Sequence, residues 1–357
     1  MSKAAELAAL IGSQSAQGNR NLIINGAMQV AQRGTSETSV TTAGYRNACD
    51  RYRVGGNNGT WTISQDTDAP AGFSNSFKML LTATETISST SYWSVEQRIE
   101  GQNLQGLAYG TSSAKTITVS FYVKSNVTGT YCLNLYQDDG SKNFPKTYTI
   151  DSANTWERKT ISFVGDTATA LDNDNAKSLR TIFFQVSGSA SNSGTPGSRA
   201  AYADNTFAAG HTAQIDAVND YWQITGLQLE VGEQATPFEH RSFGDELRRC
   251  QRYYFRTTGS STGYGNLATV SRIGNTLYRG VVEFPVTMRS RPSFSSSGSF
   301  QTLDSGFTLS SISGGDGASF DSHGVQVTMT SNGSAGQSSL LRQAADGQAA
   351  LIYDAEL

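Results

Sequence analysis

The chain has 357 residues and a formal net charge of -3, and only 16% of its residues are charged. This length allows two or three domains, each with its own core. Nucleic acid is excluded as the main partner, because phosphate binding requires a dense cationic surface. No apolar run approaches the roughly 20 residues of a membrane-spanning helix, so we expect no membrane insertion.

Cysteine and histidine are scarce. Cys49, Cys132 and Cys250 are odd in number and widely spaced, which predicts buried free thiols and no disulfide framework. None of the three histidines has the spacing of a zinc site, so we expect no metal ligands. The run 172–175, Asp-Asn-Asp-Asn, offers oxygen ligands, but it lacks the glycine and distal glutamate of a calcium loop. We therefore predict a solvated acidic turn and no cofactor, with a structural calcium ion left open.

The first 18 residues are expected to form an attachment segment. Leu7, Leu10 and Ile11 share one helical face within residues 4–11. Isolated helices shorter than about 12 residues are marginal in water. The segment therefore either docks on a partner or frays, and residues 12–18 form a flexible joint after it. The opening residues lack the apolar core of a secretory signal, so synthesis in the cytoplasm is expected.

Residues 19–241 alternate between apolar and polar side chains, which is typical of half-buried strands. In residues 116–124 the side chains of Ile117, Val119, Phe121 and Val123 point one way. Many such segments, separated by turns and without helical periodicity between them, predict an antiparallel β-sandwich.

The closing strand of this region changes phase. Trp222 and Ile224 lie on one face, whereas Leu227 and Leu229 lie on the other. The change at Gly226 predicts a β-bulge, because one extra residue is needed and glycine tolerates bulge geometry. We expect the outer half of the strand to join residues 22–28.

Residues 242–256 are predicted to form a linking helix. Ser242 and Asp245 fit a capping box. The helical spacing places a set of apolar side chains on one face, and we predict that this face forms a subunit interface: Phe243, Leu247, Cys250 and Tyr254.

Residues 257–357 return to strand-like patterns and predict a separate, smaller β-domain. The side chains of Tyr278, Val282 and Phe284 share one face of a predicted strand. Pro285 cannot donate to a ladder, so this strand should lie at an edge or carry a bulge.

Two runs resemble those of tailed-bacteriophage tail-fibre and minor structural proteins. They are residues 21–34, Asn-Leu-Ile-Ile-Asn-Gly-Ala-Met-Gln-Val-Ala-Gln-Arg-Gly, and residues 222–255, which contain Leu-Glu-Val-Gly and Thr-Pro-Phe-Glu. They look like the first and last strands of a jelly-roll module similar to carbohydrate-binding modules. The resemblance covers roughly residues 19–256. It implies an all-β fold, with an antiparallel jelly-roll sandwich followed by a short helix and a smaller C-terminal β-domain.

Aromatic side chains with polar neighbours are the candidate glycan contacts, because sugar rings pack their C–H faces on aromatic rings. The candidates are Trp61, Tyr92, Tyr136, Tyr202 and Tyr264. Trp93, Trp156 and Trp222 lie within strand patterns and are predicted to be core residues. No catalytic constellation is evident, and a sequence alone cannot place two carboxylates across a cleft as glycosidases require. We therefore expect no catalytic residues.

These observations and the resemblance together predict a virion structural protein, made in the host cytoplasm and located in the tail. The preferred hypothesis is a homotrimeric tail fibre whose N-terminal segment binds other virion proteins and whose distal domain contacts a host cell-surface glycan. A capsid decoration or head-fibre protein is the first alternative. A glycan-degrading enzyme is the second.

Overall fold

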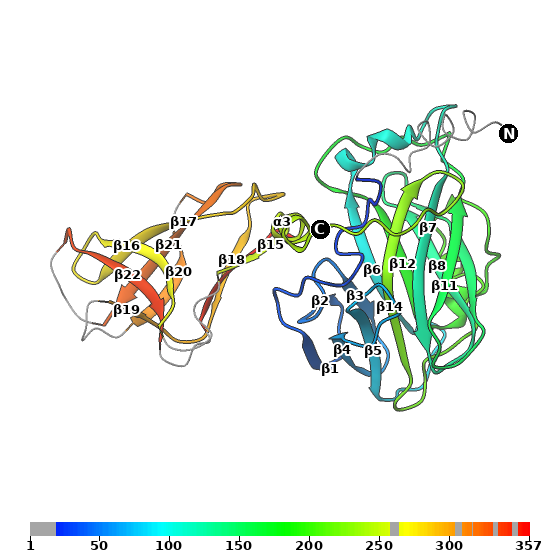
Figure 1. Ribbon diagram of the computed structural model, residues 1–357, viewed down its shortest axis with the longest axis horizontal. Coiled ribbons are helices and arrows are strands. Elements are labelled where there is room, and N and C mark those ends of the chain that lie inside the picture. Colours follow the sequence, from blue (N-terminus) through cyan, green and yellow to red (C-terminus); the bar gives the residue numbers. More distant parts are fainter. Residues whose placement is uncertain (1–18, 258–263, 304–308, 316, 331–334, 345–348) are drawn as a thin grey trace. The chain divides into compact units, whose positions relative to one another are not determined.

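The structure is a computed structural model that describes residues 19–257, 264–303, 309–315, 317–330, 335–344 and 349–357. The chain divides into two compact units, with the boundary between Glu246 and Leu247. The predicted attachment helix at residues 4–11 lies outside the described residues. Each unit is built almost entirely of antiparallel strands (Figure 1).

The first unit is a jelly-roll sandwich of two sheets, as predicted. The first sheet has six strands, in the order β1 (Ser36–Val40), β4 (Thr60–Asp66), β5 (Ser76–Ala83), β14 (Tyr221–Val231), β7 (Ile117–Ser125) and β11 (Glu157–Phe163). The second sheet has eight strands, in the order β13 (Ala200–Ala201), β9 (Lys142–Asn143), β8 (Gly129–Gln137), β12 (Lys177–Ser187), β6 (Tyr92–Glu100), β3 (Arg53–Gly56) and β2 (Gly44–Tyr45), with β10 (Pro145–Ile150) also paired to β8.

Short helices occupy the connections of this unit: η2 (Gly101–Asn103), η3 (Gln105–Leu107), α2 (Ser189–Asn192) and η4 (Asp204–Thr206).

The core fills the space between the two sheets. All four alternating side chains of β7 that were predicted to point inward are fully buried. Trp61 of β4 stacks on Trp93 of β6, with ring centroids 5.4 Å apart. Phe121 of β7 meets Phe183 of β12 edge to face at 5.0 Å. These contacts join one sheet to the other, so aromatic packing holds the two layers together.

The predicted bulge in β14 is confirmed. The register of β14 against β7 shifts between Thr225 and Gln228, and Gly226 has a φ of +61°. Beyond the bulge, the Leu22 N–H donates to the Leu229 carbonyl at 2.8 Å. The outer half of β14 therefore meets the residue 22–28 segment as expected, although that segment runs as turns and bends rather than as a regular strand.

The second unit contains two further sheets. The third sheet has the order β15 (Tyr254–Arg256), β23 (Ala350–Asp354) and β18 (Ser293–Ser297). The fourth sheet has the order β19 (Phe300–Thr302), β22 (Ser338–Gln343), β16 (Asn266–Arg272), β17 (Leu277–Glu283), β21 (Ser322–Met329) and β20 (Leu309–Gly314). The expectation of an edge or bulged strand at Pro285 was wrong, because β17 lies in the interior of its sheet and ends at Glu283, before the proline.

Helix α3 (Phe243–Gln251) is shorter than the predicted helix. The Ser242 hydroxyl accepts a hydrogen bond from the Asp245 N–H at 3.2 Å, so the predicted cap is present. Tyr254 instead begins β15 and pairs with Asp354.

The predicted subunit-interface residues on this segment do not share one exposed face. Cys250 is fully buried and Tyr254 is 5% exposed, whereas Phe243 is 57% exposed. Leu247 is half-buried. The interface prediction is therefore wrong for Cys250 and Tyr254, because the chain itself already covers them.

Candidate functional site

The outer face of the second sheet carries a row of charged side chains. Leu135, Leu179 and Val95 point into the core, so the next residues along these strands, Tyr136 and Arg180 among them, point outward. The strand register places Arg180 opposite Tyr136 on β8 and opposite Arg98 on β6.

Glu96 lies at the centre of this row. Its carboxylate contacts Arg98 at 2.7 Å, Arg53 at 3.1 Å and Arg180 at 3.3 Å. Burial by itself raises the pKa of Glu96, but the three guanidinium groups outweigh it and hold that pKa below its usual range. A general acid of a glycosidase needs the opposite shift. Glu96 is thus suited to orient arginine side chains and not to donate a proton.

Arg180 connects the charged row to an aromatic cluster. Its Nε lies 3.0 Å from Asp138 Oδ2, and its Cζ lies 4.2 Å from the ring centroid of Tyr136. Asp138 also contacts Lys177 at 2.9 Å. This guanidinium is therefore held between two carboxylates and over the face of an aromatic ring, which leaves it little freedom to move.

Tyr202 extends the cluster to the surface. Its ring meets Tyr136 edge to face at 6.0 Å and Phe207 at 5.9 Å. Its hydroxyl donates to Asp204 Oδ1 at 2.7 Å, and this hydrogen bond, with burial, raises the pKa of Tyr202 to about 12. Tyr202 is nevertheless 46% exposed. The ring is thus fixed in orientation while its face remains available to a ligand.

A hollow of about 270 Å³ lies beside Tyr202. It is lined by Thr90, Tyr92, Ala190, Ser191, Tyr202, Asp204 and Phe207. Its walls come from the start of β6 and from the loops around α2 and η4. Ligand pockets typically measure about 300–1,000 Å³, so this hollow lies just below that range and is suited to a small ligand group such as a single sugar ring.

Gly188 allows the two walls of the hollow to approach each other. Its N–H donates to the Ser91 carbonyl at 2.7 Å. A Cβ at this position would lie 2.1 Å from the Ser88 carbonyl oxygen. Any larger residue here would therefore push α2 away from the loop before β6.

The structure brings together three of the five predicted glycan contacts. Tyr92 and Tyr202 line the hollow, and Tyr136, 8% exposed, supports Tyr202 from beneath. The prediction for Trp61 was wrong. This side chain is fully buried against Trp93, and its Nε1 donates to the Asn58 carbonyl at 2.8 Å.

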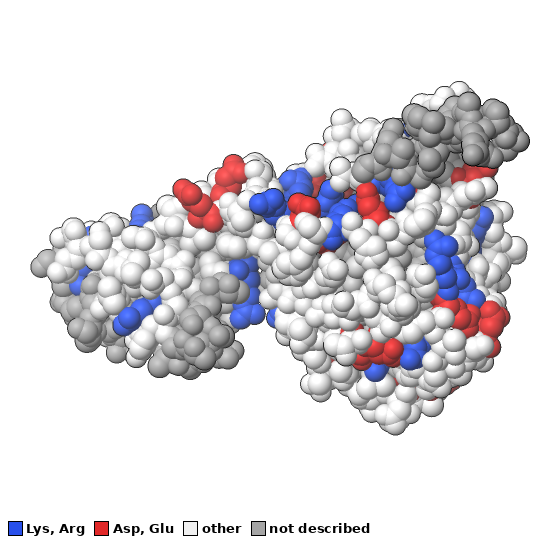
Figure 2. All heavy atoms as spheres, viewed as in Figure 1, with Lys and Arg blue, Asp and Glu red and all other residues white. Residues whose placement is uncertain are grey.

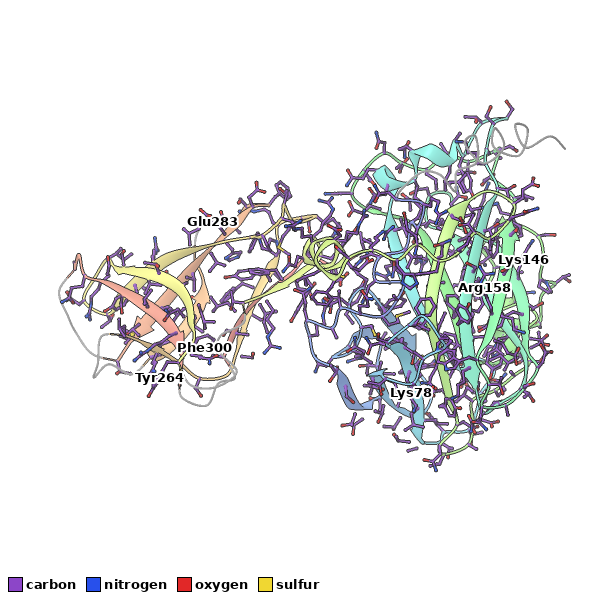
Figure 3. All side chains as sticks on the ribbon, in the orientation of Figure 1. Lys78, Lys146, Arg158, Tyr264, Glu283 and Phe300 are labelled. Atoms are coloured by element: carbon purple, nitrogen blue, oxygen red, sulfur yellow. The ribbon has the colours of Figure 1, made fainter. Side chains whose placement is uncertain are left out.

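Tyr264 belongs to the other unit (Figure 3). It is 56% exposed, and Arg342 Cζ lies 4.4 Å from its ring centroid. It does not line the second-sheet hollow.

Sequence reasoning also missed some surface residues. Trp156 was expected in the core but is half-buried, with its Nε1 donating to Asp68 Oδ1 at 3.1 Å. Arg180 and Phe207 were not singled out at all. Their roles depend on neighbours from other strands and loops, and the alternation pattern carries no such information.

The surface in general carries few charges. Figure 2 shows acidic and basic side chains in small mixed groups on an otherwise neutral face. Within the described part of the chain, no group of three or more His, Cys, Asp or Glu residues is placed to hold a metal ion. The acidic run 172–175 is exposed and irregular, and the Asp172 N–H donates to Asp139 Oδ2 at 3.0 Å. No helix among the described residues is long and apolar enough to cross a bilayer.

The chain was compared with known proteins. No protein-family model matches it, and no curated protein does. Among solved structures, it is similar to the enzymatically active domain of tailspike protein 4 of bacteriophage CBA120, with 12% identity and a TM-score of 0.33, over 59% of this chain and 21% of that one. The chain thus spans about a fifth of that domain's length.

Two bacterial sugar-binding structures are also similar. A putative sugar binding protein from Bacteroides thetaiotaomicron matches with 11% identity and a TM-score of 0.32, over 59% of this chain and all of that one. The C-terminal family 22 carbohydrate binding module of Clostridium thermocellum Xyn10B matches with 11% identity and a TM-score of 0.30, over 62% of this chain and 99% of that one. Similarity at this level carries no residue role over to this chain.

Proposed function

We propose that the chain is a non-catalytic virion protein of a tailed bacteriophage, most simply a tail fibre, which recognises a host surface glycan. The observation that carries the proposal is the fixed aromatic surface at Tyr202, bordered by Tyr92 and Asp204 and backed by the Tyr136–Arg180 stack. An aromatic ring beside hydrogen-bonding groups is suited to a sugar, because sugar rings combine apolar C–H faces with hydroxyls.

The virion assignment rests on the sequence resemblance of residues 21–34 and 222–255. We further propose a homotrimer, in which three weak sites act together. Linking binding sites raises overall avidity by about 10²–10⁴ when the geometry permits simultaneous contact. Phe243, exposed at the start of α3, and the half-buried Leu247 are the remaining candidates for contact between subunits. Light scattering that finds a stable monomer at working concentration would refute the trimer.

The test compares two exposed tyrosines. Tyr202→Ala should weaken binding of the full chain to host polysaccharide or to hits on a glycan array by about fivefold per site, since one aromatic contact contributes about 1 kcal/mol. Tyr264→Ala, in the other unit, is the matched control and should leave binding unchanged. Both variants should melt at the wild-type temperature, because neither ring belongs to a core.

The outcome also separates the alternatives. Equal binding by wild type and Tyr202→Ala would exclude the second-sheet hollow as the site. Release of reducing sugars from the bound polysaccharide would instead indicate a glycan-degrading enzyme. Imaging of labelled protein on the particle would distinguish a tail fibre from a head fibre.

A further inference from the structure

A second hollow lies on the outer face of the first sheet, on the opposite side of the sandwich core from the face described above. It measures about 530 Å³, within the usual range for ligand sites of about 300–1,000 Å³. We call it the Phe73 pocket. Its lining is Ala71, Gly72, Phe73, Ser120, Tyr122, Arg158, Gly226, Ala235, Thr236, Pro237, Phe238 and His240. None of these residues lines the second-sheet hollow.

Aromatic rings form the wall of the Phe73 pocket. Phe73 meets Phe238 at 5.0 Å, His240 at 5.3 Å and Tyr122 at 5.5 Å between ring centroids. All four side chains are half-buried or exposed. They come from the loop before β5, from β7 and from the segment after β14. Two of the four rings, those of Phe238 and His240, thus belong to the Thr-Pro-Phe-Glu-His run.

The β14 bulge shapes this wall. A Cβ on Gly226 would lie 2.7 Å from Cζ of Phe73. Because residue 226 has no side chain, the Phe73 ring can lie directly over the strand. The bulge therefore creates both the bend in β14 and the room for the pocket.

The polar side chains that line the Phe73 pocket include a guanidinium and hydroxyls but no carboxylate. Arg158 on β11 (Figure 3) donates from Nη2 to the Thr236 carbonyl at 3.1 Å. Among the described residues, no carboxylate forms an ion pair with Arg158. The hydroxyls of Tyr122 and Ser120 make no hydrogen bond with any described residue. The lining contains no Asp or Glu. The pocket thus offers a cation and hydroxyl donors without a matching anion.

We infer that the Phe73 pocket binds a sugar ring that carries a carboxylate, such as a uronic acid unit of an anionic polysaccharide. The ring's C–H face packs on Phe73 and Phe238. Its carboxylate takes the Arg158 guanidinium, whose planar fork matches a carboxylate in geometry as well as charge. A neutral sugar would form no ion pair with Arg158, and a small anion would not pack on the aromatic rings. The pocket combines both features.

The experiment uses the full chain and two probes that differ only at the carboxyl group. One is a tetrasaccharide of glucuronic acid units, and the other is the same tetrasaccharide with its carboxyls reduced to alcohols. Calorimetric titration at low salt should show at least about tenfold tighter binding of the acidic probe, because charge-assisted hydrogen bonds are the stronger kind. Equal affinity for the two probes, or binding of neither, would overturn the inference.

Variants assign the binding to the pocket. Arg158→Gln should weaken binding of the acidic probe about tenfold and leave the reduced probe unaffected, and Arg158→Lys should have an intermediate effect. Tyr122→Phe keeps the ring and removes one donor, so a smaller loss is expected. Lys146→Gln removes the same charge from β10 of the second sheet (Figure 3) and is the matched control.

The same series separates this inference from the proposed function. If Tyr202→Ala abolishes binding of the acidic probe while Arg158→Gln does not change it, the Phe73 pocket is excluded and the second-sheet site stands. If Arg158→Gln weakens binding and Tyr202→Ala does not, the acidic probe binds in the Phe73 pocket and not at the second-sheet site. The melting temperature of each variant shows whether a loss reflects unfolding.

Discussion

Single side chains connect the first segment of the sandwich to its last segment. The Glu239 carboxylate accepts hydrogen bonds from the backbone N–H groups of Asn21 at 2.9 Å and Arg20 at 3.2 Å. Arg241 contacts the same carboxylate at 3.1 Å and donates to the carbonyl of Asn21. The residues that carry the sequence resemblance thus connect the first and last segments of the unit, which is a structural role.

Asn25 and Gly26, within the opening run, also have a structural role. The Asn25 side chain donates to the carbonyls of Val30 and Asp50 and accepts from the Val30 N–H. A Cβ on Gly26 would lie 2.2 Å from the Leu227 carbonyl oxygen. The Asn-Gly pair is therefore required by a tight turn packed directly against β14.

Replacing Glu239 should reveal this connection as a pH effect. Burial raises the pKa of Glu239, but the hydrogen bonds from Asn21 and Arg20 and the charge of Arg241 hold it below its usual range. A lowered carboxyl pKa contributes stability above the ordinary value of about 4.3, and that contribution is lost as the pH falls through the folded-state pKa. Glu239→Gln should destabilise the protein by about 1–3 kcal/mol at pH 7, measured by urea unfolding.

The control for this prediction is Glu233→Gln. Glu233 is exposed, and its side chain forms no hydrogen bond or ion pair with a described residue, so the change should cost nothing measurable. The difference between wild type and Glu239→Gln should shrink at pH 3, because this pH lies below the ordinary carboxyl pKa of about 4.3 and the unfolded chain is already largely protonated there. An equal difference at pH 7 and pH 3 would show that charge is not the cause.

At the scale of elements, β14 organises the first unit. It pairs with β5 along one edge, through residues 221–224, and with β7 along the other edge, both before and after the bulge. Before Gly226 the strand contacts β5, and after it the strand meets the opening segment. With Gly226 at the bulge, β14 can thus contact β5, β7 and the opening segment.

Gly226→Ala should destabilise the first unit by at least about 1–2 kcal/mol, because its φ of +61° is in the left-handed region that side chains disfavour. The added methyl would also displace the Phe73 ring and weaken ligand binding in the Phe73 pocket.

Gly244→Ala is the control, and its expected effect has the opposite sign. Nothing lies within 4 Å of the Cβ position of Gly244, which lies inside α3. The substitution should stabilise by about 0.5–1 kcal/mol. The melting temperatures of both variants test these expectations. A Gly226→Ala variant as stable as the wild type would show that the bulge does not require glycine.

The error at the end of α3 has a physical reason. Helical periodicity continues through Tyr254, so local pattern alone favours a helix to residue 255. The competing partner is β23, about a hundred residues later, which pairs with Tyr254, Phe255 and Arg256. Hydrogen bonds to a distant strand contribute nothing to a local pattern, and they decided the conformation of these residues.

At the scale of the whole molecule, the two units have separate hydrophobic cores. Trp61, Trp93 and Trp222 belong to the core of the first unit, and Tyr278, Val327 and Tyr353 to that of the second. Each core is enclosed by its own sheets. Each unit is thus expected to unfold on its own.

Removal of residues 257–357 should leave the sandwich folded and its glycan binding intact. Such a truncated chain should melt at the temperature of the first unit within the full chain, measured by calorimetry. Its array profile should match that of the full chain at equal valency. Binding that disappears while the melting temperature is kept would place the glycan site in the second unit, near Tyr264, and would contradict the second-sheet site.

The sequence by itself determined the fold class, the inward side chains of β7, the bulge at Gly226 and the cap of α3. These features depend on neighbours within a few residues, where alternation, glycine and capping side chains act directly. Only the tertiary structure decided that Trp61 is core, that Tyr92, Tyr136 and Tyr202 share one face, and that Phe73 and Arg158 line one pocket. Those arrangements depend on which strands pair and on which loops cover them, and distant contacts of this kind leave no periodic signal in the chain.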